Sequence, residues 1–320
     1  MNILSSQEDF PAVRLRLPQL LDYLNGFLEA TRQKSEATQQ TYARTLREFA
    51  YFFTRDRRFF FRPRDVERYR RHLTRIKRLK PASVATYMTA LRRFCQYLVD
   101  CGVVGRNPAR RVPGARRAQV HSRLFLTVAE VESLLDSIET TTIVGLRDRS
   151  LVLMMLGCAC SERELAAADV GDIRRRGRQW LIYVQGKGRT AKDEAVPLPP
   201  RVYEALRAYL KARGEPKKEE PLFLSHSPRS YGCRMSVRGI REVINLRYKD
   251  SGIKGDRHFR LTPFSLRHTA GLLLAESGAS VDEIMRRMRI RWRPTAMLYF
   301  RQRGKLNSDP RLQELVRLAP

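Results

Sequence analysis

Arginine and lysine are the most abundant side chains of this chain that could do chemistry, and they favour an anionic partner. The 320 residues include 62 Lys and Arg against 33 Asp and Glu, which gives a formal net charge of +29. Self-repulsion of this charge destabilises a compact state unless a polyanion neutralises it. Basic residues exceed acidic ones in both halves of the chain. This distribution favours a protein that surrounds nucleic acid, with a general RNA-binding protein as the alternative.

Cysteine and histidine, which often hold metal ions, lack the spacing of a metal site in this sequence. The chain has five cysteines, which are too few and too scattered for a disulfide scaffold. Cys158 and Cys160 are two positions apart in an apolar stretch, and zinc ligands are not spaced in this way. We therefore expect no metal ion and no small cofactor.

Neither the N-terminus nor any apolar stretch has the features of a membrane or export signal. The first ten residues lack a basic start followed by a long apolar run. The longest apolar stretch, residues 151–160, is about half as long as a membrane helix. We expect no membrane partner and a cytoplasmic protein associated with the nucleoid.

Composition and hydrophobic pattern divide the chain into two domains. Residues 1–110 are expected to form a helical domain. Residues 111–121, RVPGARRAQVH, have the proline, glycine and arginine content of a basic linker. Residues 122–320 are expected to form the second domain.

Periodicity predicts the elements of both domains. Four helices are expected between residues 18 and 102, with Asp65 and Ser83 capping the third and fourth. In the second domain, helices are expected to surround two strands at 180–184 and 194–198, which flank a turn-rich stretch.

Five blocks of the second domain carry a more specific pattern. Four residues that end the first domain, Leu98, Gly102, Asn107 and Pro108, add to it. In this order the blocks resemble the tyrosine recombinase (phage integrase) family over nearly the whole chain. The blocks are RDRSLVLMML (147–156), SERELAAADVGDI (161–173), GKGRTAKDEAVPL (186–198), LTPFSLRHTAGLLL (261–274) and TAMLYF (295–300).

The resemblance implies a mostly α fold with a small antiparallel β-sheet. A helical, SAM-like core-binding domain and a catalytic domain would form a C-shaped clamp on DNA. The implied function is that of a site-specific recombinase or transposon integrase, which breaks and rejoins strands through a 3′-phosphotyrosine. Its implied partners are double-stranded DNA with inverted half-sites and further protomers in a homo- or hetero-tetramer.

The resemblance also implies which residues do the chemistry. Tyr299 matches the nucleophile that attacks the phosphodiester. Arg267 matches an arginine that grips the scissile phosphate, for which a planar guanidinium is well suited. Lys187, between the two predicted strands, matches the acid that protonates the leaving oxygen. Glu164 and His268 match residues that support the site.

Three family positions are substituted in this sequence. Ser161 stands where a first catalytic arginine is expected, Phe264 where a histidine is expected, and Ile290 where a histidine or tryptophan is expected. Losing one preorganised donor typically costs on the order of 10²–10³ in rate. The sequence offers several residues that could compensate: Arg163, Arg174–Arg176, His258, Arg260 and Trp292.

Two functional hypotheses follow from the retained and substituted positions. The first is an active recombinase with a divergent site, since a nucleophile has no obvious use in a protein that only binds DNA. The second is a catalytically impaired DNA-binding subunit that works with active partner recombinases.

Basic side chains in the first domain and the linker are expected to contact phosphates and to make binding strongly dependent on salt. The predicted DNA-binding residues are Arg44, Arg47, Lys80, Arg92, Arg93, Arg110, Arg111, Arg116 and Arg117.

Overall fold

Separate hydrophobic cores divide the chain into two units, Met1–Ala118 and Gln119–Pro320. The structure is a computed structural model that describes residues 10–56, 58–114, 125–186, 189–253, 255, 261–304, 306 and 311. These residues are mostly helical and contain one three-stranded antiparallel sheet, which confirms the predicted fold class. None of the helices in these ranges combines the length and the apolar character needed to cross a bilayer.

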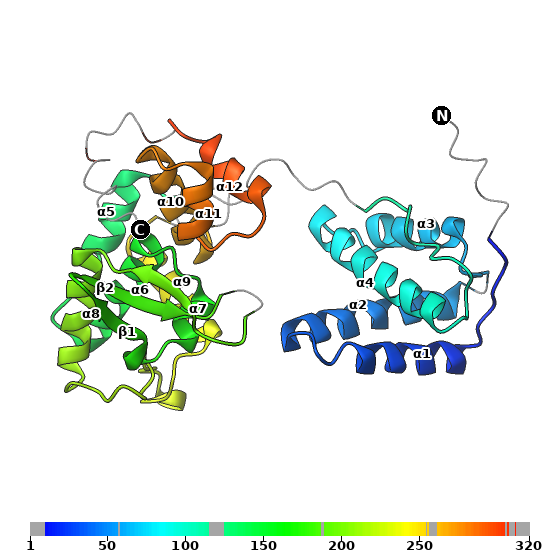
Figure 1. Ribbon diagram of the computed structural model, residues 1–320, viewed down its shortest axis with the longest axis horizontal. Helices are drawn as coiled ribbons and strands as arrows, with labels where there is room; N and C mark the ends of the chain where they lie inside the picture. The colour runs from blue at the N-terminus through cyan, green and yellow to red at the C-terminus, as the bar shows by residue number, and fades with distance from the viewer. Residues whose placement is uncertain are drawn as a thin grey trace. The chain divides into compact units, whose positions relative to one another are not determined.

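The first unit is helical, as predicted. Its elements are α1 (Leu17–Ala30), α2 (Glu36–Arg55), α3 (Pro63–Arg71), the π-helical turn η2 (His72–Ile76) and α4 (Pro81–Asp100) (Figure 1). Phe49 on α2 is fully buried, and its ring meets those of Tyr69 and Phe59 edge-on at centroid distances of 5.2 and 5.3 Å. Edge-on ring pairs add to the stabilisation from apolar burial.

Two helices of this unit begin earlier than predicted. Both α3 and α4 begin at a proline, Pro63 and Pro81, two residues before the expected caps Asp65 and Ser83. Proline favours the first helical position because its fixed φ suits the helix and its missing N–H would have no partner there. The Asp65 carboxylate still stabilises the helix start by accepting the N–H of Arg62 (3.1 Å).

The chain turns back along α4 after this helix ends. Gly102, at φ +71°, provides the left-handed turn. The Asn107 side chain then donates to the carbonyl of Arg92 (3.0 Å). Arg92 itself donates to the carbonyls of Ala109 (3.1 Å) and Val112 (2.7 Å). Arg92 therefore holds the end of this unit against α4.

The second unit places helices around the sheet. Thr127 and Glu130 form a capping box at the start of its first helix. The elements are α5 (Val128–Asp136), α6 (Ile143–Gly157), α7 (Glu162–Ala167), η3 (Val170–Asp172), β1 (Ile173–Arg176), β2 (Gln179–Val184), β3 (Glu194–Pro197), α8 (Pro200–Ala212), η4 (Pro228–Ser230), α9 (Val237–Asp250), α10 (Phe264–Glu276), α11 (Val281–Arg287) and α12 (Arg293–Phe300).

The sheet has the antiparallel order β1-β2-β3, with Ile173 opposite Ile182 and Ile182 opposite Val196. Strands β2 and β3 match the predicted strands. Strand β1 was not predicted because its sequence, IRRR, has no alternation of apolar and polar residues. It pairs through its backbone with β2, so side-chain pattern gives no signal for it.

Two helices of the second unit are buried on all sides. Every residue from Ser150 to Gly157 on α6 and from Ser265 to Ala275 on α10 is buried. Helices that are apolar all round occupy the core of a domain. In Figure 1, α10 lies beside α11 and α12. The packed core therefore fixes the position of the polar residues at the ends and along one face of α6 and α10.

Replacing Arg92 by methionine is expected to loosen the segment after α4. The variant keeps much of the apolar stem but removes the donors of two carbonyl groups, one of which belongs to buried Ala109. Amide hydrogen exchange in peptides covering residues 107–112 should become at least about tenfold faster, which corresponds to a loss of about 1.4 kcal/mol of local stability. Hydrogen-exchange mass spectrometry of the full chain measures this. The matched control is Arg93→Met, because Arg93 is exposed on the same helix. Equal exchange in both variants would contradict the structural role of Arg92.

Candidate active site

Arg267 lies on α10 with its guanidinium in the interior of the second unit, where its side chain is 10% exposed. Nη1 donates to the carbonyl of Ala159 and to Oε2 of Glu164 (3.1 Å), and Nη2 donates to the carbonyl of Met288. These acceptors lie just after α6, on α7 and at the end of α11. Arg267 therefore ties three segments together around itself.

Glu164 lies on the short helix α7, which Ser161 caps. The backbone N–H of Ser161 donates to Oε2 of Glu164 (2.6 Å), and Ser161 Oγ accepts the N–H of Glu164 (3.3 Å). This reciprocal arrangement is a capping box, and it satisfies two N–H groups at the helix start. Ser161, at the position where the resemblance implies an arginine, thus begins α7 and orients the Glu164 carboxylate.

A second buried arginine, Arg289, reaches the same carboxylate. Its side chain is 4% exposed, Nε donates to Oε1 of Glu164 (2.7 Å), and Nη2 donates to Oε2 (3.1 Å). Nη2 also donates to the Ala159 carbonyl (2.7 Å), which accepts from Arg267 as well. Arg289 was not among the predicted site residues. Its one signal in the sequence is that it precedes Ile290, a substituted family position.

The three charges in this cluster determine how it ionises. Burial by itself would raise the pKa of Glu164, but the positive charges of Arg289 and Arg267 outweigh burial and hold the pKa below its ordinary value. Burial lowers the pKa of Arg267, and Glu164 opposes this effect. Because guanidinium groups do not lose their proton in proteins, both stay charged at neutral pH. The cluster therefore carries a net charge of about +1 in the interior, from two guanidinium groups and one carboxylate.

Tyr299, on α12, forms a hydrogen bond with His268, the residue after Arg267 on α10. The tyrosine hydroxyl lies 2.6 Å from Nδ1 of His268. Tyr299 is 3% exposed and His268 is 7% exposed. Gly271, one turn further along α10, allows α12 to approach, since a Cβ there would lie 2.8 Å from Cε1 of Tyr299. The predicted nucleophile and the predicted phosphate-binding arginine are thus positioned from neighbouring residues of one buried helix.

The other two substituted positions contribute apolar packing. The Phe264 ring meets the His268 ring edge-on at a centroid distance of 4.9 Å, and Cζ of Arg267 lies 5.9 Å from the Phe264 ring centroid. Ile290 is half-buried against the apolar cluster that includes Tyr299. An aromatic and an aliphatic side chain therefore occupy positions where the resemblance implies hydrogen-bond donors.

The remaining predicted supporting residues are not brought to this cluster, or are not described. Arg163 is exposed on α7, and Trp292 is 63% exposed just before α12. Lys187, His258 and Arg260 lie outside the described residues. Within the described ranges, no group of three or more His, Cys, Asp or Glu side chains is arranged to hold a metal ion.

The predicted DNA-binding residues of the first unit differ in their surroundings. Arg92 bonds to backbone carbonyls, as described above, and Arg116 and Arg117 lie outside the described residues. Phosphate contact remains a prediction for the exposed members of the set, which are Arg44, Arg47, Lys80, Arg93, Arg110 and Arg111.

Replacing Glu164 by glutamine is expected to destabilise the second unit most strongly at neutral pH. Removing the carboxylate leaves two buried guanidinium groups uncompensated, at a cost of about 3–5 kcal/mol. Because the folded-state pKa is depressed, the contribution of Glu164 is complete above the unfolded-state pKa of about 4.3. It is lost as the pH falls through the lower folded-state pKa. The stability difference between variant and wild type should therefore shrink from pH 7 to pH 3.

Urea unfolding followed by tryptophan fluorescence measures this difference, since both tryptophans, Trp180 and Trp292, lie in the second unit. Glu242→Gln is the control because Glu242 forms an exposed ion pair with Arg238. Such pairs contribute about 0–1 kcal/mol. A Glu164→Gln variant as stable as the wild type at pH 7 would contradict the role of the carboxylate.

Comparison with known proteins identifies families for both units. Residues 124–303 match the phage integrase family, and residues 20–102 match the phage integrase N-terminal SAM-like domain.

Among curated relatives, the chain is 28% identical over 271 residues to tyrosine recombinase XerC of Pelobacter propionicus, with 83% of this chain and 85% of that protein covered. It is 29% identical over 244 residues to tyrosine recombinase XerC of Pelotomaculum thermopropionicum, with 71% and 75% covered.

Solved structures share the fold at lower identity. The XerH site-specific recombinase bound to a palindromic difH substrate superposes with a TM-score of 0.69 at 17% identity, covering 94% of this chain and 86% of that one. The Tn1549 transposon integrase in complex with a circular intermediate DNA superposes with a TM-score of 0.70 at 15% identity, covering 91% and 95%. The match to the phage integrase family spans more than half of the sequence, and the chain therefore belongs to this family of tyrosine recombinases.

Proposed function

We propose that this protein is a site-specific DNA recombinase that cleaves and rejoins duplex DNA through Tyr299. The observation that carries the proposal is the hydrogen bond between Tyr299 and His268 beside the Arg267–Glu164 ion pair. A potential nucleophile and a cation able to bind phosphate are fixed on adjoining elements of one core. Family membership supports the same chemistry in general.

The proposed cleavage step exchanges one phosphate ester bond for another. The Tyr299 hydroxyl gives up its proton to a base, for which His268 Nδ1, 2.6 Å from the hydroxyl oxygen, is the candidate. The Tyr299 oxygen attacks the scissile phosphorus, the bond from phosphorus to the 5′ oxygen breaks, and a 3′-phosphotyrosine forms. The 5′ oxygen leaves as a hydroxyl after taking a proton, and the resemblance assigns this proton to Lys187. In the reverse step a 5′-hydroxyl of another strand attacks the phosphotyrosine. The energy of the original bond is conserved in the intermediate, so rejoining requires no nucleotide cofactor.

Arg267 is proposed to bind the non-bridging oxygens of the scissile phosphate, where negative charge develops as Tyr299 attacks. Its donors are already held in place by Glu164 and by backbone carbonyls, so little reorganisation opposes the reaction. Tyr299 is 3% exposed, and its hydroxyl must come to the surface before it can reach DNA. Binding of DNA is therefore proposed to shift α12 relative to α10.

Duplex DNA is the proposed substrate because the net charge of +29 requires a polyanion and the first unit exposes arginine and lysine side chains. The recombinase and the integrase that share this fold were solved with DNA. We propose inverted half-sites as the recognition unit and a homo- or hetero-tetramer as the active assembly.

The second candidate function is that of a DNA-binding subunit that depends on active partner recombinases. The contact between the Phe264 and His268 rings favours it, because an apolar ring replaces a donor directly beside the nucleophile's partner. Ser161 and Ile290 also stand in place of the residues that the resemblance implies. Weaker selection for catalysis would produce such substitutions.

Replacing Tyr299 by phenylalanine is expected to abolish a covalent protein–DNA product while leaving DNA binding within about twofold of the wild type, since one buried hydroxyl is removed. The full-length chain first selects its site from a pool of random duplexes. That site is then nicked at each position in turn, because a nick releases the short 5′ fragment and traps the covalent intermediate. A denaturing gel detects the product.

Tyr231→Phe is the control for this experiment, because Tyr231 is 72% exposed in the same unit. Site-specific binding by the wild type without any covalent product would contradict the recombinase proposal and support the DNA-binding subunit. A product that persists in Tyr299→Phe would assign the nucleophile to another residue.

A further inference from the structure

We infer that Arg289 binds the scissile phosphate, as the second guanidinium that this chain lacks at position 161. The inference rests on the proposed recombinase function and adds a catalytic residue to it. Arg289 is not itself a family position, and its one signal in the sequence is that it precedes Ile290. Only the folded chain brings it to Glu164.

The location of the Arg289 guanidinium is the first observation. It bonds to both oxygens of Glu164 and to the carbonyl of Ala159, two residues before Ser161. The backbone N–H of Ser161 lies 2.6 Å from the same Oε2 of Glu164. An arginine at position 161 would therefore start from the backbone beside this carboxylate. Arg289 brings a guanidinium to the same carboxylate from the other side, beyond the end of α11.

The backbone of Arg289 is an independent second observation. Its φ is +54°, in the left-handed region that L side chains rarely adopt. Arg289 is the second residue after α11, next to the C-cap Met288, where glycine commonly ends a helix. Arg289 keeps this strained backbone although glycine would relieve it. The contacts of its side chain with Glu164 offset the cost of the strain. Strained residues that persist in a fold are concentrated at functional sites.

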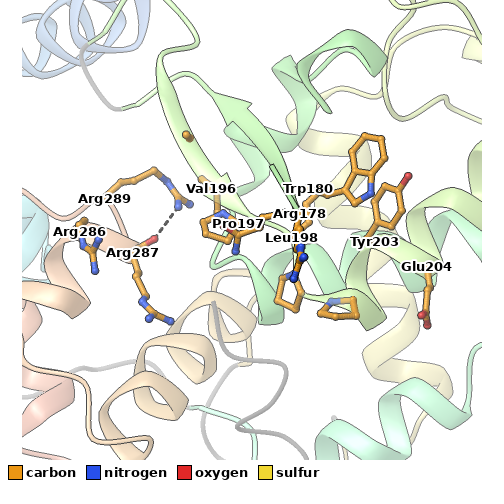
Figure 2. Close-up of a pocket in the computed structure, with 14 residues that line it drawn as sticks. Arg178, Trp180, Val196, Pro197, Leu198, Tyr203, Glu204, Arg286, Arg287 and Arg289 are labelled. Carbon is orange, nitrogen blue, oxygen red and sulfur yellow. Dashed lines mark hydrogen bonds between the residues drawn. The ribbon is translucent and has the colours of Figure 1, made fainter. Parts of the chain in front are cut away.

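The donors of Arg289 leave capacity for a phosphate oxygen. Nη1 donates to the carbonyl of Arg287 at 2.8 Å, but its other contact, to the carbonyl of Cys158, is long at 3.4 Å. A long hydrogen bond is weak, so this N–H loses little when it gives up the carbonyl for a charged phosphate oxygen. Arg289 also lines a pocket of about 790 Å³ together with Arg287 and Val196 (Figure 2).

Two guanidinium groups against one carboxylate leave the cluster with an excess of positive charge next to Tyr299. A phosphodiester carries one negative charge and gains more as the tyrosine attacks, so this excess complements the transition state. Removing one such donor reduces the rate on the order of 10²–10³-fold. We expect this loss of rate only when the scissile phosphate is charged. A purely structural role of Arg289 would reduce the rate whether or not the phosphate is charged.

The test compares Arg289→Gln with the wild type on two nicked duplexes that carry the selected site. One has a normal phosphate at the cleavage position, and the other has a neutral methylphosphonate there. We expect covalent product to form about 10²–10³-fold more slowly in the variant on the phosphodiester. On the methylphosphonate, which develops no second negative charge, wild type and variant should differ by less than about tenfold.

Arg286→Gln is the matched control, because Arg286 belongs to the same segment but is 76% exposed. A thermal midpoint and a duplex Kd for each variant establish that it is folded and binds DNA. If Arg289→Gln melts below the assay temperature, the same comparison is made at a temperature below its thermal midpoint.

Three outcomes would overturn the inference, and they differ from one another. A variant as fast as the wild type on the phosphodiester would show that the Arg289 guanidinium is dispensable. An equal loss on both duplexes would assign Arg289 a structural role only. If the wild type forms no covalent product on any nicked duplex, the proposed function itself fails, and the inference fails with it.

Discussion

One carboxylate compensates two buried guanidinium groups, and the geometry of the second unit depends on this pairing. Glu164 accepts from Arg267 and Arg289 through oxygens that the capping box with Ser161 has already oriented. An isolated buried charge costs several kcal/mol, so neither arginine can stay in place unless the carboxylate does. The end of α6, helix α7, helix α10 and the turn after α11 must therefore meet at one point.

The buried helices α6 and α10 provide the rigidity that this meeting requires. Both are enclosed by the core, so the residues at the end of α6 and along α10 cannot shift without disturbing many packed side chains. The strain of the cluster lies just outside the helices. Ala159, at φ +47°, and Arg289, at φ +54°, both have left-handed backbones, which cost on the order of 1–3 kcal/mol each. The carbonyl of Ala159 accepts from both arginines, so the strained peptide itself forms part of the site.

The residues at the three substituted family positions make defined contacts in the second unit. Ser161 caps a helix, Phe264 packs on His268, and Ile290 packs against the apolar cluster that includes Tyr299. Each stabilises the scaffold of the site at a place where the resemblance implies a polar group that acts on DNA.

The sequence by itself determined the family, the mostly helical fold and the two predicted strands, and the spacing of its motifs led us to propose Arg267 and Tyr299 as site residues. These follow from hydrophobic periodicity and from residues at recognisable spacings, both of which are local properties of the chain. Strand β1 and the position of Arg289 beside Glu164 were decided only by the tertiary structure. The strand forms through backbone pairing with β2, which leaves no side-chain pattern. Arg289 and Glu164 are 125 positions apart, and only packing of α11 against α10 brings the guanidinium to its carboxylate. Whether a buried charge is compensated depends on which segments pack together in the core. The spacing of residues along the sequence does not show which segments these are.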